Sequence, residues 1–490
     1  MNKLKTLLPF LLLLAPALSA QPVQADEKVF SLSDVVDMAK GQSPSAKLAS
    51  TNYTSKSWQY RLYQSNYLPQ LSLNATLPNL NRSINPIVQP DGTSKYEFQS
   101  LSTNSMNLSV TQNIGLTNSQ IFVSSQVQRI DILSAPLSTS YLVSPVIVGI
   151  NQPIFGFNKL IWDSRIEPLK YEEAKKQFNE DLEMVAIQGS ELFFDLLSAQ
   201  LELEIQKKNV ENTDTLYKIS TGRYNLGKIA ENDLLQMELN NMKAQNNLAQ
   251  GQLDADIAML KLANFLKLPS GQHITLIEPE AMPNFRVDEK IAVEQAEKNS
   301  QAVVAFERKK LEAERDVVKA IRDNRFSANV VASYGLSNSG AVFEAQYANP
   351  TDQQQVRLGL QIPIIDWGRA KAQIRSMEAT REYVEISVEQ DQQSLKQEVL
   401  MLSKQFEMRR QKLIISQKSD TIAQKRFDIS MKRYVIGKIG ITDLNIALQE
   451  KDQAKLEYLR DLREFWHVYY DIRRRTLYDF QANTVISNKF

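Results

Sequence analysis

Apolar and polar residues follow two different periods along this chain, and each period predicts a different kind of element. In two blocks, apolar residues recur at steps of three, four or seven, which is typical of helices that pack as coiled coils. In two other regions, apolar and polar residues alternate at every second position, which is typical of strands with one apolar face. The pattern therefore predicts long helices combined with a sheet.

The helical blocks begin after Pro168 and after Gly368, and each contains few breaks. Both are rich in Leu, Glu, Gln, Lys and Ala, which favour helix. The stretch from Pro168 to Gly227 would span roughly 87 Å and that from Gly368 to Gly437 roughly 100 Å, at a rise of 1.5 Å per residue. Helices of this length are longer than the diameter of a compact domain. The predicted seams are Leu182, Gly189, Leu196, Leu203, Val210 and Tyr217, then Val384, Val388, Leu395, Val399, Leu402, Phe406 and Leu413, continued by Ile422, Ile429 and Ile436.

One segment occurs twice, at the end of each predicted rod. The sequence RYNLGKIAENDL begins at Arg223, and RYVIGKIGITDL begins at Arg433, 210 residues later, with seven of the twelve positions identical. The glycines of the two copies, Gly227 and Gly437, suit the left-handed residue that ends a helix. Each copy therefore predicts a tight turn between two antiparallel helices.

The residues after each turn predict how the next helix starts. We expect Asn232 and Thr442 to be N-cap residues, because their short polar side chains can accept a backbone hydrogen bond. Asp233 and Asp443 then fall in the first turn, where a negative charge is favourable. The outgoing helices are predicted over roughly 232–267 and 442–480.

The same order of elements appears in both halves of the chain. The first repeat, 26–284, has a predicted helix at 33–67 with a break near Pro44, strands at about 69–156, the long helix and the turn at 223–234. The second repeat, 285–490, has a predicted helical stretch at 288–323, strands at about 325–366 and the turn at 433–444. Additional alternating segments at 106–111 and 121–128 are compatible with an extra hairpin or a long external loop.

The predicted strands each carry one apolar face. This pattern suits a transmembrane barrel with lipid outside and a wet lumen, and the alternative is a soluble sheet with a dry core. Too few strands are available to close a barrel within one chain, so several chains would have to share it. The apolar positions are Leu71, Leu73, Ala75, Leu77, Val146, Val148, Ile150, Ala328, Val330, Ala332, Tyr334, Leu336, Val356, Leu358, Leu360 and Ile362.

The N-terminus predicts export. Lys3 and Lys5 precede an apolar run and then small residues, which is the pattern of a secretory signal peptide over 1–25 with cleavage after Ser19, Ala20 or Ala25. The chain has no cysteine, so disulfides and thiolate metal sites are excluded. No later stretch of about 18 apolar residues predicts a transmembrane helix. The net charge of +1 does not favour a nucleic-acid partner.

The twin turns and the strand-to-helix junctions resemble one family. Those junctions read IPIIDWGRAKAQ at 362–373 and QPIFGFNKL at 152–160. With the duplicated order of elements, they make nearly the whole mature chain resemble the TolC-like outer-membrane efflux proteins. The resemblance implies an α+β, internally duplicated fold. It also implies a homotrimer with a long helical tunnel in the periplasm and a twelve-stranded barrel in outer-membrane lipid, to which each chain gives four strands.

The resemblance also implies roles for residues around the turns. The position matching Asp443 lines the entrance of the pore, and we expect Asp233, Tyr434 and Ile446 there as well. Ile446 stands where some relatives have a second acidic residue and Ile439 where some have a gating arginine, which favours an apolar constriction. The turns are expected to dock a periplasmic adaptor (membrane fusion) protein through Leu226, Gly227, Lys228 and Ile229 and through Ile436, Gly437, Lys438 and Ile439.

Other polar groups predict no chemistry. Arg473, Arg474 and Arg475 are interpreted as a solvated helix face, and so are Glu172 and Glu173. The two histidines, His273 and His467, are isolated, so we expect no metal site. No phosphate-binding glycine loop or nucleophile–base set is present, so we expect no cofactor and no enzymatic activity.

The resulting hypothesis is an export duct in the outer membrane. It would serve a tripartite efflux pump or a type I secretion system and receive its cargo from an inner-membrane RND or ABC transporter. A general diffusion porin and a soluble periplasmic coiled-coil adaptor are the alternatives, and the sequence leaves the exported substrate open.

Overall fold

The computed structural model describes residues 28–134, 136–269, 272–279 and 285–487. The predicted signal peptide lies outside these residues. The chain divides into two compact units, which are interleaved in the sequence. The first unit joins the residues up to Ser43 to Gly189–Met282, and the second joins Pro44–Gln188 to the residues from Pro283 onward.

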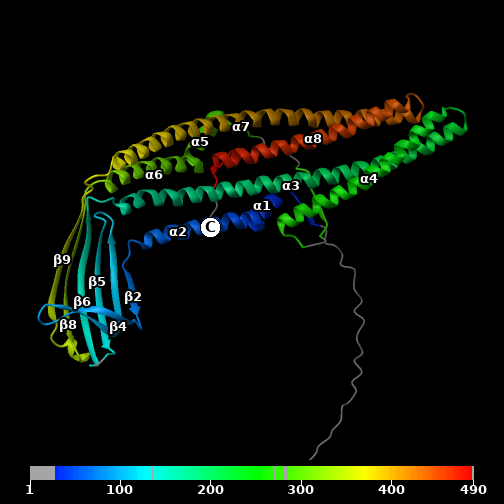
Figure 1. Ribbon diagram of the computed structural model, residues 1–490. Coiled ribbons are helices and arrows are strands. Elements are labelled where there is room, and N and C mark those ends of the chain that lie inside the picture. Colours follow the sequence, from blue (N-terminus) through cyan, green and yellow to red (C-terminus); the bar gives the residue numbers. More distant parts are fainter. Residues whose placement is uncertain (1–27, 135, 270–271, 280–284, 488–490) are drawn as a thin grey trace, which may run out of the picture. The chain divides into compact units, whose positions relative to one another are not determined.

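The four long helices confirm the duplication. Helix α3 spans Lys159–Asn225 and α7 spans Arg369–Val435, and both have 67 residues. Helix α4 spans Glu231–Leu266 and α8 spans Ile441–Thr476, and both have 36 residues. Each 67-residue helix is roughly 100 Å long. Figure 1 shows α7 and α8 side by side as an antiparallel pair.

Two predictions about the helices were wrong. Helix α3 begins at Lys159 instead of Pro168, because a proline inside a helix removes one backbone hydrogen bond without ending so long a helix. The stretch 288–323 is not continuous but forms α5, Glu289–Asn299, and α6, Gln301–Asp323. Ser300 separates them, and its hydroxyl accepts a hydrogen bond from the Ala302 N–H at 3.1 Å.

The corresponding helices at the start of the chain break where the sequence predicted. Helix α1 spans Leu32–Gln42 and α2 spans Pro44–Ser65. In the first unit, the short strands β1, Lys28–Phe30, and β7, Ile274–Leu276, pair in parallel. Gly189 of α3 lies against α1 there, because a Cβ at Gly189 would come within 3.1 Å of Ala39.

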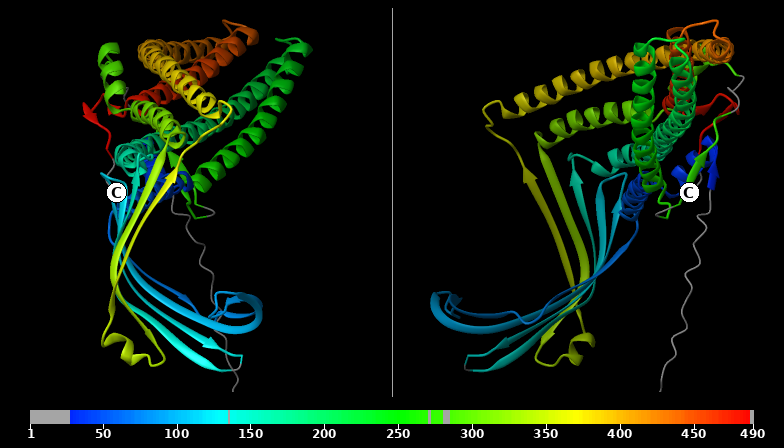
Figure 2. Two further views of the ribbon diagram at one scale, coloured as in Figure 1. Left: turned by 60° about the vertical axis from the view of Figure 1, so that its left-hand side comes forward. Right: turned by 90° about the vertical axis from the view of Figure 1, so that its right-hand side faces the viewer.

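The large antiparallel sheet of the second unit has the order β2-β4-β5-β6-β8-β9. A small antiparallel pair, β10 Tyr478–Asp479 and β11 Thr484–Val485, follows α8. The shorter strand β3 pairs with the N-terminal half of β4, beyond the end of β2. In Figure 2 the strands twist and curve, and the β3–β4 ribbon extends away from the others. The bounds are β2 Gln70–Thr76, β3 Leu80–Val88, β4 Ser94–Ile114, β5 Ser119–Ile132, β6 Ser138–Ile154, β8 Ser327–Gly340 and β9 Thr351–Gln361.

This sheet settles the question that the alternating segments at 106–111 and 121–128 left open. They lie in β4 and β5, which form a hairpin inside the sheet, not an external loop. The number of four strands per chain, which the resemblance implied, is therefore wrong for this protein. Six strand positions lie side by side, because β4 and β5 are inserted between β2 and β6.

The register places the apolar side chains of all six strand positions on one face. Leu71 lies beside Val110, Val110 beside Val123, and Val123 beside Val148. The opposite face is largely polar, with Ser72 beside Ser109 and Ser109 beside Ser124. We call the first face the apolar face. Its exposed members are Leu71, Leu73, Met106, Leu108, Val110, Ile121, Val123, Val146, Val148, Tyr334, Val356, Leu358 and Leu360.

The two long helices that follow strands of the sheet have different hydrogen-bonding arrangements at their N-termini. Before α7, Trp367 and Gly368 have left-handed backbones, with φ of 55° and 85°. The Asp366 carboxylate accepts hydrogen bonds from the Ala370 N–H at 2.9 Å and the Gly368 N–H at 3.0 Å, which hold the pKa of Asp366 below its usual value. Before α3, the Asn158 side chain accepts from the Ile161 N–H at 3.2 Å.

The core of the helical part of the second unit lies between α5, α6, α7 and α8. The predicted seam of α7 is buried there from Val388 to Leu413. The continuation through Ile422, Ile429 and Ile436 was wrong, since these three side chains are exposed. The heptad that contains Phe406 and Leu413 continues instead through Phe427 and Tyr434, which are buried. The core cluster comprises Ala292, Ala296, Phe306, Val388, Leu395, Val399, Leu402, Ile472 and Phe480.

The interpretation of Arg473–Arg475 as a solvated face was also wrong. Arg473 is only 15% exposed, and its guanidinium donates to Glu183 at 3.1 Å and to Asp479. Burial alone would lower the pKa of Arg473, but the attraction of Glu183 and its neighbours outweighs burial and raises that pKa. Arg474 contacts Glu180 at 3.2 Å. These arginines therefore tie the end of α8 to α3.

A second ion pair joins helices within this unit. Arg308 of α6 donates to Glu173 of α3 through Nη2 at 3.1 Å. The interpretation of Glu173 as part of a solvated face was wrong as well, because its carboxylate accepts hydrogen bonds from Gln301 and Arg308 of α6 and is largely buried.

We predict that Arg473→Ala destabilises the protein strongly. Glu183 is fully buried, and removal of one partner of a buried ion pair typically costs about 3–5 kcal/mol. The control is Arg460→Ala, whose exposed pair with Glu457 is worth at most about 1 kcal/mol. Urea denaturation of the detergent-purified protein, followed by circular dichroism, should show a lower midpoint for Arg473→Ala only. Equal midpoints for the two variants would contradict a structural role of this pair.

Candidate functional site at the helical turns

The two helical turns have the same backbone. The Gly227 N–H donates to the Tyr224 carbonyl at 2.7 Å, and the Gly437 N–H donates to the Tyr434 carbonyl at 2.8 Å. Both glycines have a positive φ, 69° for Gly227 and 73° for Gly437. The predicted left-handed glycine at the end of each rod is confirmed. We call Leu226–Ile229 the first tip and Ile436–Ile439 the second tip.

The helices after the tips start without a side-chain cap. The predicted N-caps Asn232 and Thr442 were wrong, since the caps are Ala230 and Gly440 and neither makes a side-chain hydrogen bond. A residue with no capping side chain leaves the amide groups of the first turn available to other partners. Asn232 and Thr442 are instead the second residues of α4 and α8.

The carboxylates of the turns are exposed. Asp233 and Asp443 lie in the first turns of α4 and α8, as predicted. Both side chains face solvent in the single chain. Asp233 belongs to the first unit and Asp443 to the second.

The tyrosines at the two turns differ in environment although their sequences match. Tyr434, in the last turn of α7, is only 4% exposed. Tyr224 is 39% exposed. The two copies of the repeated segment are therefore equivalent in backbone but not in the surface that they present.

Both tips present apolar side chains to solvent. Leu226 is 73% exposed and Ile436 is 64% exposed. Gly227, Lys228, Gly437 and Lys438 are also exposed, while Ile229 and Ile439 are half-buried. Exposed apolar side chains at the ends of long helices have no packing role within their own unit.

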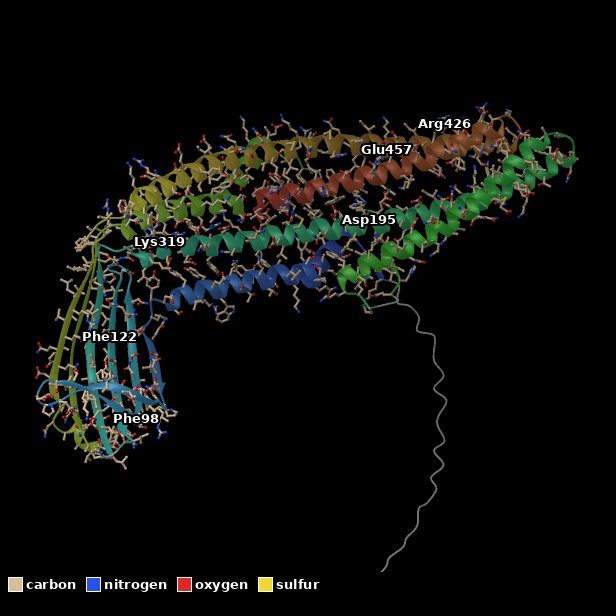
Figure 3. The ribbon with its side chains drawn as sticks, viewed as in Figure 1. Phe98, Phe122, Asp195, Lys319, Arg426 and Glu457 are labelled. Carbon is tan, nitrogen blue, oxygen red and sulfur yellow. The ribbon has the colours of Figure 1, made fainter. Side chains whose placement is uncertain are left out.

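An open groove beside the second tip contains residues that sequence reasoning missed. Three cationic side chains from α7, Lys425, Arg426 and Arg433, lie along the same groove as Asp443 of α8. Arg426, labelled in Figure 3, forms an ion pair with Glu450 across the two helices. The groove is lined by Ile422, Lys425, Arg426, Ile429, Ser430, Arg433, Ile439, Asp443 and Ile446.

A signal for this groove was present in the sequence. Arg426 and Arg433 are seven residues apart, next to the exposed row of Ile422 and Ile429. That spacing places basic and apolar residues along one side of α7. The groove therefore combines an apolar strip, which includes the predicted Ile446, with a positive rim and one predicted carboxylate.

The described residues show neither a metal centre nor a membrane-spanning helix. Among them, no group of three or more His, Asp or Glu side chains could hold a metal ion. Within the same part of the chain, no helix is both long enough and apolar enough to cross a membrane.

Comparison with solved structures shows the fold. An outer membrane channel from Campylobacter jejuni, CmeC, is 13% identical, with 94% of this chain and 87% of that chain covered and a TM-score of 0.66. VceC from Vibrio cholerae is 12% identical. The match covers 91% of this chain and 95% of VceC, with a TM-score of 0.63. The MtrE channel from Neisseria gonorrhoeae is 15% identical. The match covers 91% of this chain and 88% of MtrE, with a TM-score of 0.60.

Comparison with protein families shows where the chain belongs. No curated protein sequence matches it. Residues 35–266 and 292–465 match the outer membrane efflux protein family, so the match covers most of both repeats and includes both tips. This chain belongs to the outer membrane efflux protein family, and it is an efflux duct of the outer membrane with long helices in the periplasm.

Proposed function

We propose that three copies of this efflux protein form one passive duct, which takes cargo from an inner-membrane transporter through a periplasmic adaptor. The transporter would be of the RND or ABC class and would supply the energy. The observation that carries the proposal is a sheet with two open edges and an exposed apolar face. The number of three copies is what the resemblance to TolC-like proteins implies.

The open edges require further strands. Within the described residues, β2 and β9 each have a strand partner on one side only. An unpaired strand edge presents N–H and C=O groups, and each group costs several kcal/mol when it enters hydrocarbon without a partner. Successive strand positions in the order are antiparallel, so β2 and β9 run in opposite directions. Pairing β9 of one copy with β2 of the next therefore continues the antiparallel pattern around a ring.

The apolar face supports a position in lipid. Val356, Leu358 and Leu360 alternate along the edge strand β9 and are all exposed. Leu71 and Leu73 do the same on the opposite edge strand, β2. Lipid would cover this face while the polar face lines the lumen.

The long helices and this face argue against the two other functions. A general diffusion porin needs strands and loops, but it has no use for two 67-residue helices. A soluble adaptor would not expose an apolar sheet face of this extent.

We further propose that the tips dock the adaptor. Leu226 and Ile436 supply exposed apolar side chains, and Lys228 and Lys438 supply a positive charge beside each. Three copies would present six such tips. The first and second tips would contact the adaptor differently, because Tyr224 is exposed and Tyr434 is buried.

We predict that Gly437→Pro abolishes adaptor binding while the trimer still forms. Proline fixes φ near −65° and has no N–H, whereas Gly437 has a φ of 73° and donates to Tyr434. Strain of about 1–3 kcal/mol at the tip corresponds to a loss of affinity of about 5- to 150-fold. Binding is measured by affinity capture with candidate adaptors that are expressed one at a time.

The matched control is Gly437→Asn. Asparagine tolerates a left-handed backbone and keeps its N–H, so this variant should retain binding. If Gly437→Pro captured as much adaptor as the unchanged protein, docking at the second tip would be rejected.

The groove beside the second tip is proposed as part of the gate. Asp443 faces solvent at the start of α8, and three copies would bring three such carboxylates to the entrance. Close carboxylates attract cations and repel anions. The positive charges of Arg433 and Lys425 oppose this effect within each groove. The ion selectivity therefore depends on the balance between these cations and the Asp443 carboxylate.

We predict that Asp443→Asn shifts the ion selectivity of the open duct toward anions. The substitution removes the carboxylate and leaves Lys425, Arg426 and Arg433 along the groove. The reversal potential of single channels in a planar bilayer with a salt gradient reports the shift. Glu457→Gln, on the same helix but away from the turn and labelled in Figure 3, should leave the potential unchanged. An unaltered potential in Asp443→Asn would exclude a carboxylate ring at the entrance.

A further inference from the structure

Two of the six strand positions have no counterpart in the second half of the chain. In the second repeat, β8 and β9 form one hairpin between α6 and α7. In the first repeat, four strand positions lie between α2 and α3. The additional pair, β4 and β5, separates β2 from β6.

The additional hairpin is built into the sheet along its whole length. Strand β5 pairs with β4 from Ser119 to Ile132 and with β6 from Gln120 to Ile132, with a single bulge. Phe122 of β5, labelled in Figure 3, covers Gly149 directly opposite on β6. A Cβ at Gly149 would meet the Phe122 ring at 2.3 Å, so only glycine fits beneath this ring.

The turn between β4 and β5 is held at the helical end of the sheet. Its carbonyl groups accept hydrogen bonds from Gln152 of β6 and from Asn158, which directly precedes α3. At its base, Gln112 and Asn113 donate to the carbonyl groups of the two residues that follow α2. The hairpin is thus fixed to the segments that join the strands to α2 and α3. The contacts are Gln112 Nε2 to Tyr67 O at 2.6 Å, Asn113 Nδ2 to Asn66 O at 3.1 Å, Asn158 Nδ2 to Gly115 O at 2.9 Å and Gln152 Nε2 to Thr117 O at 2.9 Å.

The hairpin also continues both faces of the sheet. Met106, Leu108 and Val110 of β4 lie on the apolar face, and so do Ile121 and Val123 of β5. Their apolar side chains are exposed like those of the flanking strands. A hairpin that belonged to an external loop would have no reason to keep this face in register with its neighbours.

We infer that each copy contributes six strands to the shared sheet, so that three copies close an eighteen-stranded wall. This inference rests on the proposed trimeric duct. An even number of strands per copy allows β9 of one copy to meet β2 of the next in antiparallel fashion. A twelve-stranded wall would require β4 and β5 to leave the sheet and β2 to pair directly with β6.

The additional strands set the width of the passage through the membrane. The diameter of a closed sheet grows roughly linearly with strand number, so eighteen strands give about 1.5 times the diameter of twelve. Closed sheets of 16–18 strands leave an open aqueous channel. The membrane part of this duct therefore admits bulky solutes, and size selection falls to the tips.

Cysteine pairs test the strand order, because the natural chain contains no cysteine. Leu71, Val110, Val123 and Val148 lie at one level on four successive strands. Neighbours in an antiparallel sheet have Cα atoms about 5 Å apart, whereas positions three strands apart are separated by roughly 14 Å. In outer membranes treated with an oxidation catalyst, L71C/V110C and V110C/V123C should form intrachain disulfides, and L71C/V148C should form none.

The opposite result would overturn the inference. If L71C/V148C cross-linked as fully as L71C/V110C, β2 and β6 would be neighbours and the hairpin would lie outside the wall. L71C/S109C, whose side chains point to opposite faces, is the control for specificity. The variants are compared only where the untreated protein retains the assembly of the unchanged chain on native gels.

A separate pair of edges tests the trimer on which the inference rests. Leu73→Cys on β2 is combined in turn with V356C, L358C or L360C on β9, and one combination should give a covalent species of three chains. If the intrachain pattern holds but no combination gives that species, the eighteen-stranded wall and the trimeric duct both fail, while the six-stranded chain stands. If the covalent trimer forms together with a β2–β6 disulfide, only the eighteen-stranded wall fails.

Discussion

The architecture depends on one constraint, which is that the backbone N–H and C=O groups at the edges of the sheet need hydrogen-bond partners. A sheet with an apolar face is suited to lipid, but its two edge strands, β2 and β9, carry N–H and C=O groups that lipid cannot satisfy. One chain cannot bend six strands far enough to join its own edges around an open lumen. In the proposed duct, assembly with other copies is therefore a requirement of the backbone, and side-chain contacts between copies come second.

The duplication places helices at both ends of each strand region. Helix α3 is matched residue for residue by α7, and α4 by α8, at the same offset that separates the two turns. The strand regions do not match in this way, because the first contains the additional hairpin β4–β5. The hairpin leaves the helical ends of the sheet unchanged, since its turn is held between the end of α2 and the start of α3. In the proposed trimer, a wider wall could therefore be combined with unaltered helices.

The two turns show how one backbone can present two surfaces. Gly227 and Gly437 make the same hydrogen bonds and have nearly the same φ. The buried Tyr434 and exposed Tyr224 make the surroundings different, as does the basic groove along α7 beside the second turn. The two copies thus share the geometry that reverses the chain direction but differ in the surface around it.

The sequence by itself determined the long helices, the glycine turns, the strand faces and the family. These features depend on local patterns: heptad spacing, a left-handed glycine and period-two alternation each act over a few residues. Local pattern did not determine the position of β4 and β5, because strand order depends on pairing between residues that are distant along the chain. It also misplaced Ile422 and Ile429 in the seam and Arg473 on a solvated face. The exposure of the two isoleucines is decided by which side of α7 meets α8, and the burial of Arg473 by the ion pairs between the end of α8 and α3. Only the tertiary structure fixes those contacts.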